Sequence, residues 1–177
     1  MFVKHFETIA YLKDGTPRQK QAYSVLLQYQ ILESLAEYTP ILAGTIPLNI
    51  DIESSDLDII CCYTHKNSFI ENLLQLFNGF SNFNLKETSI NSTETVIVNL
   101  TADNFEVEIF GQQVAVKEQL AYRHMITEYS LLQHYGEELR QEIVTLKKQG
   151  YKTEPAFAKA LGLSGDPYQA LLEYKID

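Results

Sequence analysis

Apolar residues recur every three or four positions between Thr16 and Pro40, and this spacing predicts the first helix of the chain. Thr16 can cap that helix, Pro17 suits its first turn, and Gln19 completes a capping box. Pro40 ends the run, because a proline disfavours the helical conformation in the residue before it. The apolar stripe consists of Ala22, Leu26, Tyr29, Leu32 and Leu35. We interpret this stripe as the side of the helix that packs on the core.

Five short segments that are apolar, or that alternate between apolar and polar residues, predict strands. The expected strands are 41–43, 56–63, 83–90, 94–101 and 105–110. Residues 102–104 are expected to form a hairpin loop between the last two strands. A helix is expected at 67–78, between the second and third strands, because apolar residues there return to helical spacing.

From Val116 onward the pattern is helical, with breaks at Gly136 and Gly150. The expected helices are 117–134, 137–149, 153–161 and 167–175. This order of elements predicts an α+β fold, in which a mixed β-sheet is flanked by helices and carries a C-terminal helical extension. We expect one compact unit, with an α/β core and N-terminal helix in 1–115 and a helical tail packed on it in 116–177.

The composition is that of an ordinary globular protein. Hydrophobic residues make up 45% of the 177 positions and aromatic residues 11%, which excludes a disordered chain. A chain of this length buries enough surface to need no disulfide or structural metal. The two cysteines, Cys61 and Cys62, are adjacent, and neighbours on a strand point to opposite faces, so we expect no structural disulfide.

The chain carries no sign of a membrane partner or of secretion. Its first residues, 1–6, are followed by acidic and polar residues instead of the apolar segment of a signal peptide. No apolar stretch approaches the roughly 18 residues that a membrane-spanning helix needs. The expected location is therefore the cytoplasm.

Fourteen basic and twenty-three acidic residues give a net charge of −9. This balance disfavours a long nucleic acid as partner, because no run of Lys and Arg offsets the repulsion. We interpret Lys147, Lys148 and Lys152 as solvated side chains. Nucleotides are not excluded, because metal ions can neutralise a triphosphate, and a small molecule or a protein is favoured as the second substrate.

Asp56 and Asp58 lie at the start of the expected apolar strand 56–63, with Leu57 between them. Alternation on a strand places both carboxylates on one face and Leu57 in the core. Two carboxylates held so close repel each other, which raises a pKa unless a cation relieves them. Oxygen ligands of this kind suit Mg²⁺, although an Asp-x-Asp pattern also fits a solvated strand edge.

Two further features strengthen the interpretation as a nucleotide site. Gly44 and Thr45 follow the short strand 41–43, where a glycine allows close approach to a phosphate and the amide groups and hydroxyl can donate to it. Glu106 and Glu108 share one face of the apolar strand 105–110, so either could join the aspartates. An edge strand with one wet face is the alternative.

Together these residues resemble the nucleotidyltransferase superfamily, the polymerase-beta-like fold. The resemblance rests on 42–45, on 56–59 ten residues later, and on 107–109, where Glu108 stands between two apolar residues. The pattern of that superfamily is a small apolar strand, a Gly-Gly or Gly-Ser pair, an Asp-x-Asp or Asp-x-Glu motif about ten residues later, and then a third carboxylate between apolar residues. The resemblance implies a nucleotidyltransferase-like mixed sheet in the core of this chain.

A second resemblance covers nearly the whole chain. The segments that carry it are 44–47, 55–61, 108–112, 121–124 and 153–158. They look like the bacterial domain-of-unknown-function family 4269, which is grouped with nucleotidyltransferases. This resemblance supports the fold and says nothing of the substrate.

The resemblance implies a role for each matching residue. Gly44 and Thr45 would bind phosphate, and Asp56, Asp58 and Glu108 would be the catalytic residues and the ligands of two Mg²⁺ ions. The chain departs from the superfamily pattern by Thr45 in place of serine and by glutamate in place of aspartate at the third carboxylate, for which Glu106 competes with Glu108.

Arg123 and His124, in the next helical segment, are further candidates for binding the nucleotide or the acceptor. The alternative for this pair is a surface arginine and a hydrogen-bonded histidine.

The expected activity is transfer of a nucleoside monophosphate from a nucleoside triphosphate to a small-molecule or protein acceptor, with release of pyrophosphate. Two alternatives remain open. One is a catalytically inactive regulatory or antitoxin-like nucleotide-binding module, and the other is a metal-dependent phosphoester hydrolase.

Overall fold

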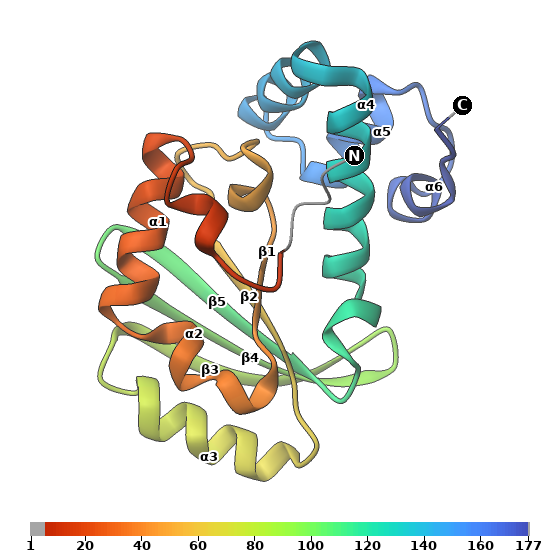
Figure 1. The fold of residues 1–177 in the computed structure, drawn as a ribbon. Helices are drawn as coiled ribbons and strands as arrows, with labels where there is room; N and C mark the ends of the chain where they lie inside the picture. The colour runs from red at the N-terminus through yellow and green to blue at the C-terminus, as the bar shows by residue number, and fades with distance from the viewer. Residues whose placement is uncertain (1–5, 177) are drawn as a thin grey trace.

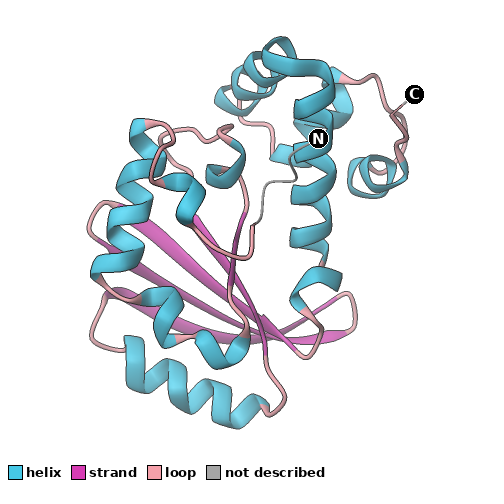
Figure 2. Cartoon of the chain, in the orientation of Figure 1, coloured by secondary structure: helices cyan, strands magenta, loops and turns pink. Residues whose placement is uncertain are grey.

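A five-stranded mixed sheet separates two groups of helices in this protein, for which a computed structural model describes residues 6–176 (Figures 1 and 2). Residues 1–5 of the expected 1–115 core and residue 177 of the expected 116–177 tail lie outside the described residues. The strands are β1 (Ile41–Ala43), β2 (Leu57–Cys62), β3 (Ser81–Ile90), β4 (Thr93–Ala102) and β5 (Phe105–Gln112). The helices are α1 (Pro17–Gln28), α2 (Ile31–Ser34), α3 (Lys66–Phe77), α4 (Leu120–Lys148), α5 (Thr153–Ala160) and α6 (Pro167–Glu173).

The sheet order is β1-β2-β5-β4-β3. β2 and β5 are parallel neighbours at its centre, and all other neighbouring pairs are antiparallel. Between β2 and β5 the chain passes through α3 and the β3–β4 hairpin. Because the register pairs Asp58 with Glu108, strand alternation places these two side chains on the same face. The expected α+β fold with a mixed sheet is confirmed.

The start of α1 agrees with the sequence pattern, but its end does not. The Thr16 side chain accepts a hydrogen bond from the Gln19 backbone, and the Gln19 side chain accepts one from the Thr16 backbone. The helix was expected to continue past Leu32, yet it ends at Gln28. Gln30 has a φ of 52°, so the chain turns there and Ile31 begins the separate α2. This turn allows residues of α2 to enter the core.

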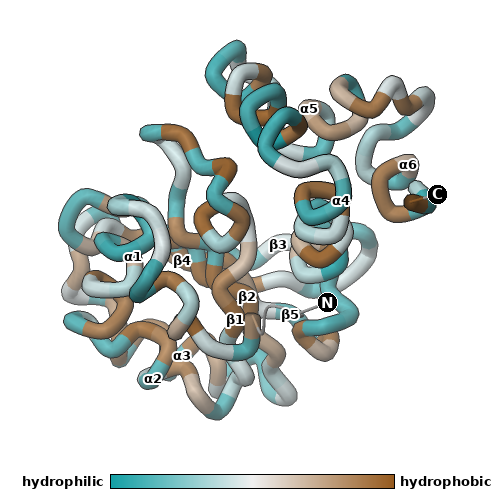
Figure 3. Tube along the Cα trace, turned by 45° about the horizontal axis from the view of Figure 1, so that its top comes forward, coloured by the Kyte–Doolittle hydropathy of each residue, from teal (hydrophilic) through white to brown (hydrophobic). Residues whose placement is uncertain are grey.

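Two hydrophobic cores lie on opposite faces of the sheet. The first core joins the sheet to α1–α3, and its members include Leu26, Ile31, Leu57, Ile59, Phe69, Phe77, Val107 and Ile109. The second core joins the other face to α4–α6, and its members include Ile41, Ile60, Met125, Leu131, Ile143, Phe157 and Leu171. Figure 3 shows hydrophobic residues concentrated at β1 and β2, whereas hydrophobic and hydrophilic residues alternate along α4. Odd-numbered residues of β2 thus face the first core, and Asp58 faces the side that α4 covers.

The helix α4 is interrupted at Gly136, as expected from the sequence. Gly136 has φ 73° and ψ −153°, a conformation open only to glycine. The two halves of α4 consequently run in different directions (Figure 1), and residues of both halves, Leu131 and Ile143 among them, enter the second core. The interruption therefore sets the position of every residue from 137 to 148.

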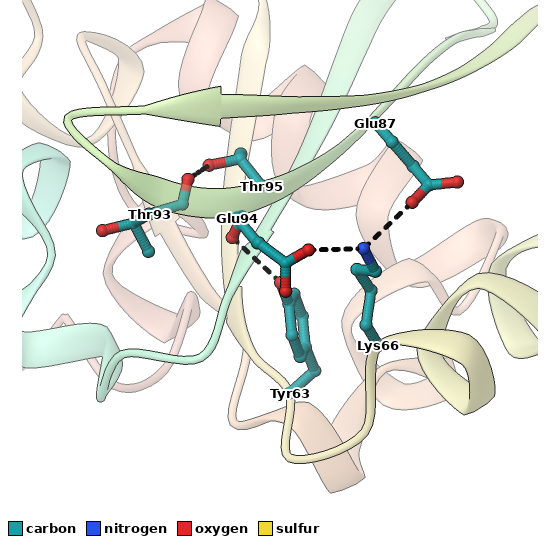
Figure 4. A network of polar contacts seen from close by, with 6 residues as sticks. All are labelled: Tyr63, Lys66, Glu87, Thr93, Glu94 and Thr95. Carbon is teal, nitrogen blue, oxygen red and sulfur yellow. Dashed lines mark hydrogen bonds and ion pairs between the residues drawn. The ribbon is translucent and has the colours of Figure 1, made fainter.

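A polar network fixes the start of α3 to the β3–β4 hairpin (Figure 4). The Lys66 Nζ lies 2.7 Å from a Glu94 carboxylate oxygen and 3.2 Å from one of Glu87. The Tyr63 hydroxyl donates to the Glu94 carbonyl oxygen at 2.9 Å. These exposed ion pairs contribute little stability, but they connect the start of α3 to both strands of the hairpin.

None of the helices in the described part of the chain is both long enough and apolar enough to cross a membrane.

Candidate active site

A cleft of about 560 Å³ lies between the helices α4 and α5 and the face of the sheet that carries the second core. The sheet contributes Asp58 and Glu108, and the loop after β1 contributes Gly44 and Thr45. Asp56 enters from the residue before β2, so that strand begins one position later than expected. The structure thus brings five of the predicted site residues together in one place.

Gly44 is required at its position for two reasons. Its φ of +75° is a backbone conformation that side chains with a Cβ rarely adopt. In addition, a Cβ at this position would overlap with the Asp58 carboxylate oxygen Oδ2. The Asp58 carboxylate therefore occupies the space that the missing side chain leaves open, directly beside the loop that was predicted to bind phosphate.

Thr45 has a structural partner in the loop that precedes β2. Its hydroxyl donates to the Ser55 Oγ at 3.2 Å, and that same oxygen accepts the Ile52 amide at 2.9 Å. The hydroxyl proton of Thr45 is thus engaged within the protein. Ser54 and Ser55 also line the cleft, and the sequence reading did not single them out.

The carboxylates of the cleft perturb one another. Burial, with the charges of Asp56 and Glu108 as smaller causes, raises the pKa of Asp58 to about 7, while Lys147 acts in the opposite direction. Burial also raises the pKa of Glu108, with Asp56 as the second cause. The repulsion expected between the carboxylates is therefore present, but burial is the larger cause.

Glu108, and not Glu106, occupies the inner position. Glu108 pairs with Asp58 in the register of β2 and β5 and lines the cleft. Glu106 is exposed, pairs with Thr101 on β4, and is not among the residues that line the cleft. This placement favours Glu108 as the third carboxylate.

The donor set fits Mg²⁺ together with a nucleotide. Within residues 6–176, no group of three or more His, Cys, Asp or Glu side chains is arranged to hold an ion by itself. Mg²⁺ usually keeps waters and shares its ligands with substrate phosphates, so such an enclosed site is not required. Asp58 and Glu108 offer oxygen ligands side by side, and the raised pKa of Asp58 shows that a cation there would relieve an unfavourable arrangement.

Arg123 and His124 are separated by the geometry of α4. Arg123 is exposed and lies outside the cleft, because consecutive helical residues point about 100° apart. Its predicted contact with phosphate is therefore not supported. His124 lines the cleft, but its Nε2 lies 3.0 Å from the Tyr168 carbonyl oxygen and its Nδ1 lies 3.6 Å from a Glu154 oxygen. A carbonyl only accepts, so Nε2 carries a proton and ties α4 to α6.

Lys147 corrects the sequence analysis, which treated it as solvated. It is 7% exposed and lines the cleft, where its charge acts on Asp51, Asp56 and Asp58. Burial lowers the pKa of its ammonium group, while Glu128 is the first of the carboxylates that raise it. A signal was available in the sequence, because Lys147 follows the buried Ile143 by four residues and so continues the inner side of α4.

Glu128 and Glu154 are further cleft residues that the sequence did not indicate. Glu128 is 3% exposed, and burial together with the Glu154 charge raises its pKa to about 8. Both residues come from helices expected to be amphipathic, and local spacing does not show which face of the sheet those helices cover. Only the packing of α4 and α5 places them in the cleft.

Several solved structures share the fold. They include the Cid1 poly(U) polymerase with MgGTP bound, with a TM-score of 0.57 and 11% identity over 80% of this chain and 48% of that one. A chain of the GLD-2/RNP-8 complex has a TM-score of 0.53 and 14% identity over 89% and 63%. A cytoplasmic RNA terminal U-transferase has a TM-score of 0.53 and 16% identity over 89% and 52%. At such identities the likeness establishes a nucleotidyltransferase fold and nothing finer.

The chain spans about half the length of the Cid1 structures that it matches. No curated protein matches its sequence. A family profile matches residues 24–174, in agreement with the resemblance carried by the motifs. Since this match covers most of the sequence, the chain belongs to the family described as domain of unknown function DUF4269.

Proposed function

We propose that the protein is a Mg²⁺-dependent nucleotidyltransferase, which transfers a nucleoside monophosphate from a nucleoside triphosphate to an acceptor hydroxyl. The observation that carries this proposal is the juxtaposition of Gly44, Asp58 and Glu108. The glycine loop leaves room for the Asp58 carboxylate, and the parallel register sets Glu108 beside it. A phosphate-binding loop next to paired carboxylates is suited to metal-assisted phosphoryl chemistry.

Each residue of the cleft has a role in this proposal. Asp56, Asp58 and Glu108 would hold two Mg²⁺ ions, which supply charge neutralisation once a triphosphate is bound. The backbone amides that follow Gly44 donate to the phosphates, and the Lys147 ammonium group offsets their charge from the side of α4. All of these groups line the same cleft.

The transfer step requires an acceptor hydroxyl held near the α-phosphorus. The acceptor oxygen forms a bond to that phosphorus, and the bond from the phosphorus to the bridging oxygen of the β-phosphate breaks. Pyrophosphate leaves with the electron pair of that bond, and the proton of the hydroxyl passes to the Glu108 carboxylate. Glu108 is suited to accept a proton, because burial raises its pKa above the usual range for glutamate.

The acceptor is a small molecule or a protein in this proposal, as the net charge of −9 suggests. Two of the structural neighbours are RNA-directed enzymes by their descriptions, a poly(U) polymerase and an RNA terminal U-transferase. An RNA oligonucleotide is therefore included among the candidate acceptors in the test.

The test measures melting temperature and product formation with Mg²⁺ and each of the four nucleoside triphosphates. We expect one triphosphate to stabilise the protein by about 2.7 kcal/mol at a concentration of roughly 100 times its Kd. Glu108→Gln should abolish this gain, whereas Glu106→Gln, on the same strand but outside the cleft, should retain it.

Products then separate the alternatives. Pyrophosphate together with a labelled acceptor supports the transferase. Triphosphate binding without any product identifies the inactive regulatory or antitoxin-like module, and cleavage of a phosphoester without transfer identifies the hydrolase. The absence of a thermal shift with every triphosphate would contradict nucleotide binding altogether.

A further inference from the structure

The helical side of the cleft differs in chemistry from the sheet side. We define the α4–α5 wall as Gln119, Glu128 and Glu154, which line the cleft opposite the sheet carboxylates. The proposed roles of the aspartates and Glu108 do not use this wall. Its three side chains share one property, because each presents an oxygen that accepts hydrogen bonds.

Gln119 presents an acceptor that lacks a donor. The residue is 2% exposed, and its Nε2 donates to the Cys61 and Val114 carbonyl oxygens, each at 2.9 Å. Since both of those partners only accept, the amide nitrogen must face them and the orientation of the side chain is fixed. The Gln119 Oε1 is then buried without a hydrogen-bond partner among the described residues. Such an atom is costly unless a ligand donates to it.

Glu128 presents a second acceptor without a partner. No hydrogen bond or ion pair joins its side chain to another residue in the range 6–176, although only 3% of the residue is exposed. The charges that act on its carboxyl group are those of Glu154, which raises its pKa, and Lys147, which lowers it. Glu154 faces the Nδ1 of His124, and that atom can donate to Glu154 only when the imidazole carries both protons. The wall therefore offers carboxylates with too few donors to satisfy them.

The charge of the whole cleft favours the same kind of ligand. Six lining residues are acidic, namely Asp56, Asp58, Glu108, Glu118, Glu128 and Glu154. Among the described lining residues Lys147 alone is a lysine or arginine. Loading with nucleotide does not reverse this excess, because the charge of two Mg²⁺ roughly offsets that of a triphosphate. A cationic ligand that enters next would favour the ionised form of these carboxyls, including Glu128, whose pKa burial raises to about 8.

We infer that the α4–α5 wall binds the protonated amines of a small, hydroxyl-bearing acceptor, an amino alcohol, amino sugar or polyamine derivative. This inference rests on the proposed function and names the class of its acceptor. Gln119 and Glu128 are nine residues apart, about 13 Å along a helix, so the wall suits an acceptor with more than one donor group. Apolar residues of the cleft such as Ile60, Phe110 and Met125 can contact its carbon skeleton. A polyanion such as RNA is repelled by the same wall.

Calorimetric titration with spermidine tests the wall without requiring turnover. The titration uses excess Mg²⁺ and physiological salt, so that the sheet carboxylates are occupied and weak surface binding is screened. Glu128→Gln and Glu154→Gln should each weaken spermidine binding roughly tenfold or more, because each removes one charge-assisted contact. Glu142→Gln is the matched control, since Glu142 is exposed on the same helix, and it should bind as the parent does. Fully N-acetylated spermidine, which has lost its charge, should not bind.

Equal affinity of spermidine for the parent and both wall variants would overturn the inference, as would equal binding of the acetylated compound. Tighter binding of a short RNA oligonucleotide than of spermidine would overturn it in favour of an RNA acceptor. The thermal shift with Mg²⁺ and triphosphate is measured on the same proteins. A triphosphate shift without wall-dependent spermidine binding refutes the acceptor class alone. Wall-dependent spermidine binding without any triphosphate shift refutes the proposed function and leaves the cation site standing.

Discussion

Gly44 shows how one residue joins the backbone of the loop to the chemistry of the cleft. Its φ of +75° and the overlap of any added Cβ with the Asp58 Oδ2 predict that Gly44→Ala loses about 2 kcal/mol or more of unfolding free energy. Urea unfolding measures the loss. Gly79→Ala is the control, because Gly79 has no positive φ and its added Cβ meets nothing within 4 Å.

A double-mutant cycle separates the two causes at Gly44. In the background of Asp58→Ala the overlap is absent and only the backbone strain remains, so Gly44→Ala should cost less there than in the parent. An equal cost in both backgrounds would show that Asp58 does not occupy the space beside Gly44.

Asp58 is predicted to lower the stability of the ligand-free protein and to be required for binding Mg²⁺ and triphosphate. Burial raises its pKa from 3.8 to about 7, so its ionised form is unfavourable in the folded protein without a cation. Asp58→Asn should therefore be as stable as the parent or more so at pH 8 without ligand, and should lose the melting-temperature gain from Mg²⁺ and triphosphate. Melting curves of both proteins, with and without ligand, measure the two effects. Strong destabilisation of the ligand-free variant would instead reveal a structural partner of Asp58.

At the scale of the element, the interruption of α4 positions the second half of that helix. Gly136→Ala should cost about 1–3 kcal/mol, because φ 73° with ψ −153° is open only to glycine. The same change should reduce the triphosphate-induced shift, since Lys147 lies beyond the interruption. Gly162→Ala serves as control: its φ is +67°, its added Cβ meets nothing within 4 Å, and it follows α5. That variant should lose stability and keep the full shift.

Elements were predictable from the sequence where local rules decide them. The capping box at Thr16, the alternation that sets Asp58 and Glu108 on one face and the interruption at Gly136 all follow from neighbouring residues. The turn at Gln30 did not, because the left-handed residue there is a glutamine and carries no turn signal.

The helical half of the cleft was missed for a related reason. Helical spacing shows that α4 and α5 are amphipathic, but the face of the sheet that they cover depends on long-range packing. The spacing of Lys147 from Ile143 indicates an inward side chain, but the position of Lys147, Glu128 and Glu154 opposite the aspartates is visible only in the folded structure. Lysine and glutamate are usually exposed, so the residue types themselves predicted solvated side chains at these positions.

At the scale of the whole molecule, the raised pKa values make ligand-free stability depend on pH in one direction. The folded-state pKa values of Asp58 and Glu128 are raised to about 7 and about 8, and burial also raises those of Asp51 and Glu108. A carboxyl whose folded pKa is raised contributes stability below its unfolded pKa and loses that contribution as the pH rises through the folded pKa. The unfolding free energy should thus fall, by up to a few kcal/mol, between about pH 5 and about pH 8. Lys147 acts in the opposite direction, because its pKa is lowered, so single variants are needed to isolate each carboxyl.

Thermal melts of the parent, Glu128→Gln and Asp58→Asn across this pH range measure how much Glu128 and Asp58 each contribute to the pH dependence of stability. The melting temperature of each variant should fall less steeply with pH than that of the parent. Glu142→Gln, at an exposed position on α4, should keep the parental slope. Saturating Mg²⁺ and triphosphate should remove the share of Asp58, because a bound cation favours the ionised carboxylate, and should leave that of Glu128. A ligand-free stability that rises with pH throughout this range would mean that the cleft carboxyls are not buried in solution, and the electrostatic basis of the proposed site would be lost.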